Sequence, residues 1–135
     1  MVDFHHANLG VPVDGVDAEA AFLIDVLGYR RVSVDEQLQR MGANWFEADD
    51  GSQIHLSPDP DHRPAARAHV AVAFGSELDE IERRLQKSEI AFDSSQRPGF
   101  PRVLFCQDPA GNRWELRGDQ GSKTDSINKT DSIKA

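Results

Sequence analysis

The sequence predicts an α+β fold made of two tandem βαβββ modules, with helices packed against one face of the strands. First, residues 50–56 have the sequence DGSQIHL and residues 110–116 have the sequence AGNRWEL, so a glycine turn leads twice into an alternating strand. Second, residues 6–11 (HANLGV) match residues 69–74 (HVAVAF) near the start of each half. Third, the proline-rich and charged residues 58–67 separate the halves as a linker. A long unit that occurs only twice indicates a duplicated supersecondary module and not a solenoid.

The first module covers about residues 4–57. Alternating residues 4–11 predict its first strand. A helix is predicted over residues 18–27, with Asp17 as its N-cap and Gly28 just after its end. Three further strands are predicted over residues 29–35, 38–47 and 52–57, which completes the βαβββ order.

The second module covers about residues 68–117 and repeats this order. A strand over residues 69–74 is followed by a helix over about 77–88, in which Leu78, Ile81 and Leu85 recur at helical spacing. Strands are predicted near residues 90–93, 101–107 and 112–117. Residues 1–118 therefore form one predicted domain, and the polar residues 119–135, which hold a short tandem repeat, form a predicted flexible C-terminal tail.

Composition restricts the classes of partner. The 135 residues suit one domain with a real core, and the net charge of −8 argues against nucleic acid and anionic membrane surfaces. An acidic surface tolerates a cationic ligand but more commonly serves solubility. No apolar run approaches the ~18 residues of a membrane helix, and the N-terminus lacks a signal-peptide pattern. A single cysteine excludes an internal disulfide, so we expect a cytoplasmic protein.

Strand alternation places four potential metal ligands on equivalent faces. His6, His55, His69 and Glu115 all fall on the strand face opposite the apolar residues that would pack on the helices. If the two sheets curl towards each other, the four side chains meet. Neutral imidazole and carboxylate groups suit Zn²⁺, Ni²⁺, Fe²⁺ or Mn²⁺. In this register His5 faces the helices, and His62 lies in the linker, where we expect it to be exposed to solvent.

Several segments together match a known family. They are HANLGV at residues 6–11, AFLIDVLGY at 21–29, AHVAV at 68–72 and DPAGNRWEL at 108–116. Over about residues 3–118 the chain resembles the vicinal oxygen chelate superfamily, which includes glyoxalase I, bleomycin-resistance proteins, fosfomycin-resistance enzymes and extradiol dioxygenases. The resemblance implies a cupped mixed sheet around a divalent metal, with helices on its outer face and His6, His69 and Glu115 as ligands. It also implies modules that pair within one chain or across two, and we expect a homodimer.

The role of His55 separates the activities within that superfamily. His55 stands where glyoxalase I has a glutamate that binds metal and transfers protons, and near the position of a catalytic histidine in extradiol dioxygenases. It is therefore a fourth ligand, a general base, or neither; neutral imidazole is a competent base near pH 7. The second module lacks the further His and Tyr residues that a dioxygenase needs, and no cation loop of the fosfomycin-resistance type is present.

Together with the four potential ligands, the resemblance implies a metal-dependent lyase or isomerase that acts on a small oxygenated substrate through vicinal oxygens, and we expect His55 and Glu115 to be its catalytic residues. The alternatives are a drug-sequestering resistance protein without catalysis and a small extradiol-type dioxygenase. Substrate contacts are expected from residues on the predicted cavity side, of which the two arginines suit a carboxylate. These residues are Asn8, Trp45, Gln53, Arg102 and Arg113.

Overall fold

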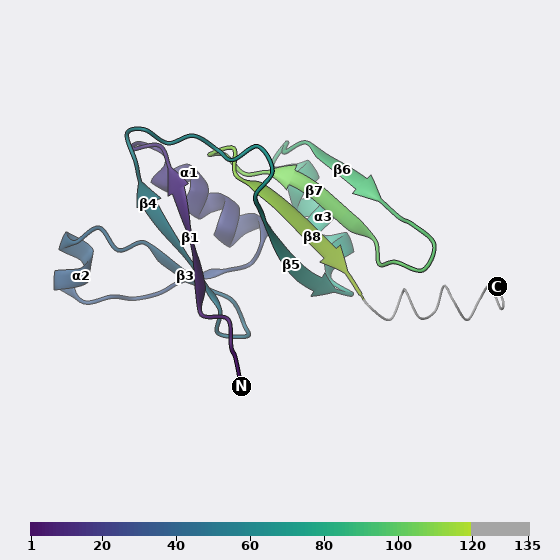
Figure 1. Ribbon diagram of the computed structural model, residues 1–135, viewed down its shortest axis with the longest axis horizontal. Helices are drawn as coiled ribbons and strands as arrows, with labels where there is room; N and C mark the ends of the chain where they lie inside the picture. The colour runs from purple at the N-terminus through teal and green to yellow at the C-terminus, as the bar shows by residue number, and fades with distance from the viewer. Residues whose placement is uncertain (120–135) are drawn as a thin grey trace. The chain divides into compact units, whose positions relative to one another are not determined.

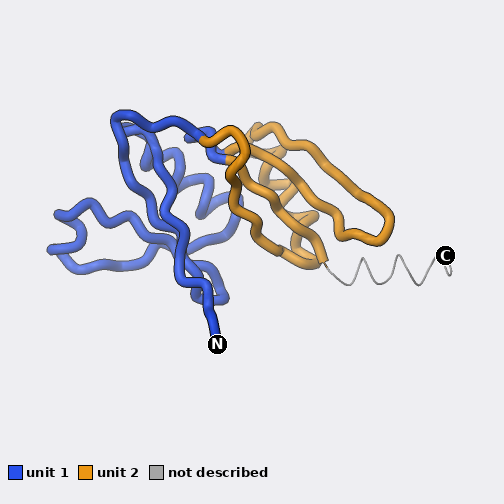
Figure 2. Tube along the Cα trace, in the orientation of Figure 1, with its two compact units in different colours: residues 1–64, 108–112 blue, residues 65–107, 113–135 orange. Residues whose placement is uncertain are grey.

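The repeat in the sequence corresponds to two copies of one strand topology. In the computed structural model, which describes residues 1–119, the chain divides into two compact units (Figures 1 and 2). Unit 1 comprises Met1–Pro64 and the turn Asp108–Asn112, and unit 2 comprises Ala65–Gln107 and the chain from Arg113 onward. Apart from its first residue, the predicted tail at 119–135 lies outside the described residues.

Unit 1 has a four-stranded mixed sheet in the order β1-β4-β3-β2, in which β1 is parallel to β4 and the other pairs are antiparallel. Its elements are β1 (His6–Val11), α1 (Val16–Ala21), the π-helix η1 (Phe22–Val26), β2 (Arg30–Arg31), α2 (Glu36–Arg40), β3 (Trp45–Glu47) and β4 (Gln53–Pro58).

Unit 2 repeats this topology in the order β5-β8-β7-β6, again with one parallel pair, β5 and β8. Its elements are β5 (His69–Gly75), α3 (Leu78–Lys87), β6 (Phe92–Ser95), β7 (Val103–Gln107) and β8 (Arg113–Gly118). The fold is therefore the predicted α+β arrangement of tandem βαβββ modules. None of the helices in the described part of the chain has the length and apolar character needed to cross a bilayer.

The core of each unit lies between its helix and one face of its sheet. On β4, Ile54 and Leu56 are buried while Gln53, His55 and Ser57 are not, as the alternation predicts. The same holds on β8, where Trp114 and Leu116 are buried and Glu115 between them is not. Because the apolar face of each sheet is packed into the core, the opposite face is left for polar side chains.

The segment between β2 and β3 differs from the prediction. Strands were expected over residues 29–35 and 38–47, but only Arg30–Arg31 and Trp45–Glu47 are paired, and Glu36–Arg40 forms α2. The side chain of Asp35 caps this helix by accepting from the Leu38 N–H at 2.8 Å, and Arg40 pairs with Glu36 at 2.6 Å. The helix contains no β-branched residue, so local capping and helix propensity prevail over strand pairing.

The first helix also differs in detail. It begins at Val16 and not after Asp17, its N-cap is Gly15 without a side-chain cap bond, and its second half is the π-helix η1. Asp17 instead lies in the first turn, where an acidic side chain complements the helix dipole. Gly28 follows the helix with φ 85°, the left-handed conformation expected of it.

Candidate metal centre

In unit 1 the strand register brings His6 and His55 together. His6 lies opposite Gln53 and Asn8 lies opposite His55 in the parallel β1–β4 pair, so His6 and His55 are diagonal neighbours on one face. Their rings are stacked, with centroids 3.9 Å apart and planes at 14°. Two imidazoles from two strands therefore lie side by side on the sheet face opposite the core.

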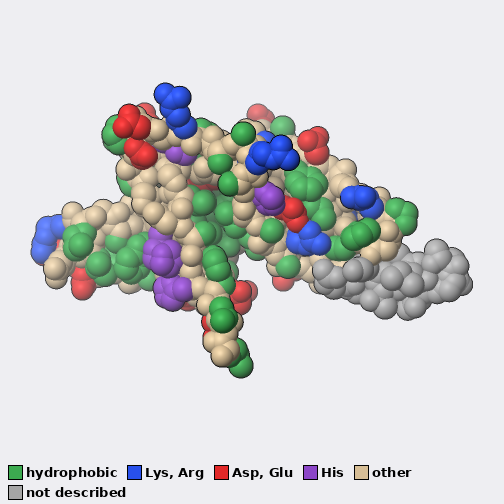
Figure 3. Space-filling view, in the orientation of Figure 1, with side chains coloured by type: hydrophobic (Ala, Val, Ile, Leu, Met, Phe, Trp, Pro, Cys, Tyr) green, Lys and Arg blue, Asp and Glu red, His purple; other side chains and the backbone are tan. Residues whose placement is uncertain are grey.

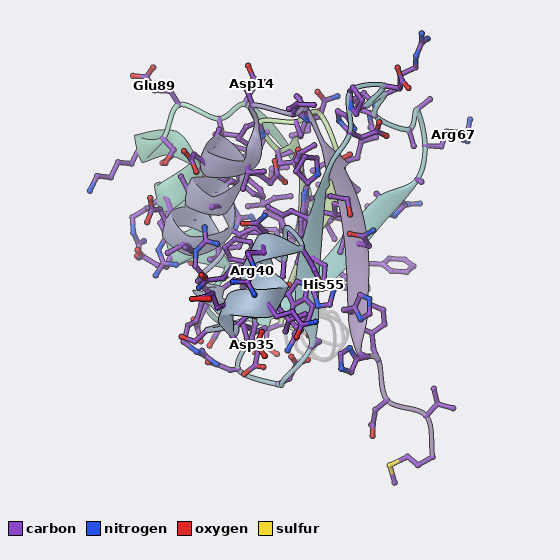
Figure 4. All side chains as sticks on the ribbon, turned by 90° about the vertical axis from the view of Figure 1, so that its left-hand side faces the viewer. Asp14, Asp35, Arg40, His55, Arg67 and Glu89 are labelled. Atoms are coloured by element: carbon purple, nitrogen blue, oxygen red, sulfur yellow. The ribbon has the colours of Figure 1, made fainter. Side chains whose placement is uncertain are left out.

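The ring of Trp45 packs against His55 on the side away from His6. Trp45 lies opposite His55 in the β3–β4 pair, and their rings stack at 4.6 Å and 14°. His5 precedes β1 and was expected to face the helices; instead its Nδ1 lies 2.8 Å from Nδ1 of His6. Strand alternation does not apply to His5, because β1 begins only at His6. Figure 4 labels His55, and Figure 3 shows histidine side chains gathered near the N-terminal strand.

His55 is also tied into a polar chain along β3 and β4. Its Nε2 lies 2.8 Å from Oε1 of Gln53, and Nε2 of Gln53 donates to Oε1 of Glu47 at 3.1 Å. Desolvation lowers the pKa of His55 below its ordinary value of 6.5, and the nearby His6 and His5 lower it further. The imidazole is therefore neutral at pH 7, the form that binds metals and accepts protons.

In unit 2 the same register brings His69 and Glu115 together. His69 lies opposite Arg113, so Glu115, two residues further along β8, takes the diagonal position that His55 has relative to His6. Nε2 of His69 is 3.4 Å from Oε1 of Glu115, and the other carboxylate oxygen of Glu115 accepts a hydrogen bond from Arg117. The repeat thus positions two equivalent pairs of donors, one in each unit.

The hydrogen bonds of His69 leave its Nε2 directed at the Glu115 carboxylate. Nδ1 of His69 lies 3.0 Å from the backbone oxygen of Arg67, and a carbonyl oxygen can only accept, so Nδ1 carries the hydrogen. In the neutral ring, the lone pair of Nε2 then faces a carboxylate oxygen, and only a shared proton or metal ion makes that contact favourable. An imidazole N–H donated to a backbone carbonyl is the usual support of a metal-binding histidine.

The other residues that were predicted to contact substrate lie in different environments. Asn8 accepts from the Ser57 hydroxyl at 2.9 Å, and Arg113 is exposed beside His69 in the β5–β8 pair. Arg102 is engaged elsewhere, because its guanidinium pairs with Asp79, at 2.8 Å, and with Glu82, both on α3.

Two residues on the ligand-bearing faces were missed by the sequence reasoning. Phe105 lies opposite Glu115 in the β7–β8 pair, as Trp45 lies opposite His55 in the β3–β4 pair. Extending the comparison of the two modules to these neighbouring strands would have identified Phe105. Arg117 follows Glu115 by one strand period and contacts its carboxylate. His62, expected to be solvent-exposed, is instead half-buried, with Nε2 2.9 Å from the backbone oxygen of Ala110, because the linker folds back onto the 108–112 turn within unit 1.

Each of the two pairs by itself offers two potential metal donors. Among residues 1–119, no group of three or more His, Cys, Asp or Glu side chains is placed to hold a metal ion. The imidazole and carboxylate donors of the two pairs have the chemistry of Zn²⁺, Ni²⁺, Fe²⁺ and Mn²⁺ ligands. The donor types therefore fit a divalent metal.

The repeated strand topology defines a protein built from two tandem βαβββ modules. The family model of the Glyoxalase/Bleomycin resistance protein/Dioxygenase superfamily matches residues 3–116, and the chain belongs to that superfamily. This confirms the resemblance drawn from the sequence. No curated protein matches the chain significantly.

Solved structures support the same fold. A glyoxalase family protein from Bacillus anthracis is 25% identical, with a TM-score of 0.76, and the match covers 88% of this chain and 96% of that one. The fosfomycin resistance protein FosX from Listeria monocytogenes, solved with Mn(II) and sulfate, is 17% identical with a TM-score of 0.71, covering 91% and 94%. Lactoylglutathione lyase from Agrobacterium tumefaciens is 21% identical with a TM-score of 0.62, covering 89% and 96%. The last two similarities concern the fold alone.

Proposed function

We propose that this chain is a metal-dependent enzyme of the lyase or isomerase type, which acts on a small oxygenated substrate through chelation of vicinal oxygens. His6, His55, His69 and Glu115 are the proposed ligands of Zn²⁺, Ni²⁺, Fe²⁺ or Mn²⁺. The observation that carries the proposal is the His69–Glu115 pair, in which Nδ1 is committed to a backbone carbonyl and Nε2 faces a carboxylate oxygen at 3.4 Å. The equivalent diagonal placement of His6 and His55 supplies the other two donors.

The chain's own residues have separate roles in this proposal. A bound divalent metal supplies Lewis acidity, which polarises the substrate oxygens it chelates. His55, neutral at pH 7, accepts a proton from the substrate if it is not itself a ligand, and Glu115 is the second candidate for proton transfer. Arg113 is exposed beside the His69–Glu115 pair and suits a substrate carboxylate. Asn8, Trp45 and Gln53 are the proposed contacts on the unit 1 side, while the paired Arg102 is a weaker candidate.

We further propose that the protein acts as a cytoplasmic homodimer, which needs neither nucleic acid nor membrane. The single cysteine and the net charge of −8 support this setting. The predicted domain at residues 1–118 would then contribute one donor pair from each module, either to a single intrachain site or to sites shared by two chains.

Metal analysis tests the proposal directly. Purified protein should hold about one divalent ion per chain by elemental analysis, and His69→Ala should reduce this by at least about tenfold, because it removes a ligand. His62→Gln is the matched control, since His62 is a histidine outside both pairs, and should leave the metal content unchanged. Protein without stoichiometric metal, in which His69→Ala changes nothing, would contradict the proposal.

The identity of the metal and the ligand distinguishes the alternatives. Ni²⁺ or Zn²⁺ supports isomerase or lyase chemistry, whereas Fe²⁺ with oxygen consumption supports the extradiol dioxygenase. Metal-free protein that binds a cationic glycopeptide with measurable heat supports the drug-sequestering protein, and an absence of heat counts against it.

A further inference from the structure

The hydrogen-bond partners of His55 determine which of its two ring nitrogens is free. A neutral imidazole has one N–H and one lone pair, and the partner of one nitrogen fixes the function of the other. Nε2 of His55 lies 2.8 Å from the side-chain oxygen of Gln53. If this oxygen is held in place, Nε2 must carry the hydrogen and Nδ1 must carry the lone pair.

Glu47 holds the Gln53 amide in that orientation. Nε2 of Gln53 donates to Oε1 of Glu47 at 3.1 Å, and a carboxylate can only accept, so a flipped amide would place two oxygens in contact. Oε2 of Glu47 also lies 3.8 Å from the Arg30 guanidinium. Arg30, Glu47 and Gln53 lie opposite one another across β2, β3 and β4, so the register itself aligns this chain of contacts.

We infer that Gln53, oriented by Glu47, is a positioning residue that holds His55 in the Nε2–H tautomer and leaves Nδ1 as its ligand or proton acceptor. This inference rests on the proposed function for its role in chemistry. Its geometry rests only on contacts within unit 1. The Trp45 and His6 rings stacked on either side of His55 oppose any tilting of the imidazole away from Gln53.

The second module has an arginine at the position equivalent to Gln53. Arg113 occupies in β8 the position that Gln53 occupies in β4, opposite His69 as Gln53 is opposite His6. A guanidinium only donates, so it cannot accept from the Nε2–H of His55. Gln53→Arg therefore places a hydrogen-bond donor beside Nε2 of His55, which favours the tautomer with the lone pair on Nε2. Gln53→Glu instead keeps a hydrogen-bond acceptor there.

The test is the tautomer of His55 in metal-free, full-length protein at pH 8, measured by long-range ¹H–¹⁵N NMR on ¹⁵N-labelled histidine. His55→Gln identifies the signals of His55. We expect the Nε2–H form in the wild type and in Gln53→Glu, and a fall of at least about fivefold in the ratio of Nε2–H to Nδ1–H in Gln53→Arg, since one hydrogen bond is worth about that factor. Gln37→Arg, on exposed α2, controls for added charge and should change nothing.

An unchanged tautomer ratio in Gln53→Arg, with the variant folded by circular dichroism, overturns the inference, as does an Nδ1–H form in the wild type. Metal titration then separates the inference from the proposed function. Gln53→Arg should weaken metal binding about tenfold or more and Gln53→Glu should not, as expected for a residue that orients a ligand. A reversed tautomer with unchanged metal affinity supports the inference and removes His55 from the ligand set.

Discussion

Glu19 is a carboxyl group without solvent exposure in the interior of unit 1. Its Oε1 accepts from the Ala110 N–H at 3.3 Å. Burial, a side-chain hydrogen bond with Asp108 and the negative charge of Asp108 together raise its pKa far above the ordinary value of 4.5. Glu19 is therefore protonated in the folded protein at neutral pH.

This proton makes stability depend on pH. Above pH 4.5 the unfolded chain loses the proton that the folded chain keeps, so the free energy of unfolding falls as pH rises. Glu19→Gln mimics the neutral carboxyl group and removes this loss. It should be more stable than the wild type by about 1–3 kcal/mol at pH 7 and equal to it near pH 4.5, as measured by urea unfolding.

Glu77→Gln provides the control, because Glu77 is exposed and should give the wild-type pH profile. A Glu19→Gln profile parallel to that of the wild type between pH 4.5 and 8 would show that Glu19 is ionised in the folded state.

At the scale of elements, the two strand-connecting turns that carry the repeated glycine differ in what surrounds them. Gly51, before β4, and Gly111, before β8, have φ of 89° and 86°. A Cβ at Gly51 would meet nothing within 4 Å, whereas a Cβ at Gly111 would lie 2.7 Å from the Pro64 ring. Gly111 also lies in a turn that is held within unit 1, where Asn112 donates to the Gly10 backbone oxygen at 2.9 Å.

Alanine at these two glycines should therefore have unequal effects. Both substitutions place a side chain in the left-handed conformation, at a cost of about 1 kcal/mol. Gly111→Ala must in addition displace a rigid proline ring and should lose about 1–3 kcal/mol more in urea unfolding. Equal losses for the two variants would mean that the contact of the turn with Pro64 does not persist in solution.

The same elements show what sequence could and could not predict. Alternation along β1, β4, β5 and β8 placed both donor pairs on the correct faces, because strand period alone decides the face. The residues around α2 were assigned to strands because short apolar spacing there fits either structure, and the Asp35 cap decides between them. The contacts of His62, Glu19 and Arg102 depend on tertiary partners distant in sequence, which no local pattern specifies.

At the scale of the whole molecule, the duplicated modules carry two side-chain pairs that are equivalent in position and different in chemistry. Unit 1 offers two imidazoles stacked with an indole, and unit 2 offers an imidazole and a carboxylate flanked by two arginines. The proposed metal centre takes both pairs as its ligands. The proposed homodimer could combine the pairs within each chain or between chains, and these arrangements respond differently to paired mutations.

Complementation between variants distinguishes the two arrangements. His6→Ala breaks the unit 1 pair and Glu115→Ala breaks the unit 2 pair, so each variant alone should bind metal poorly. In a dimer with shared sites, a mixed dimer combines the intact unit 1 pair of one chain with the intact unit 2 pair of the other. Random co-refolding of equal amounts should then restore about a quarter of the wild-type metal sites.

His6→Ala mixed with His55→Ala is the matched control, because both variants lack an intact unit 1 pair and no mixture can rebuild one. Metal bound per chain, measured after removal of free ions, is the readout. Restoration in the first mixture and none in the control assigns the sites to pairs of chains. No restoration in either mixture, with dimers present by light scattering, assigns each site to a single chain, because mutated donors in one chain then have no substitute in the other.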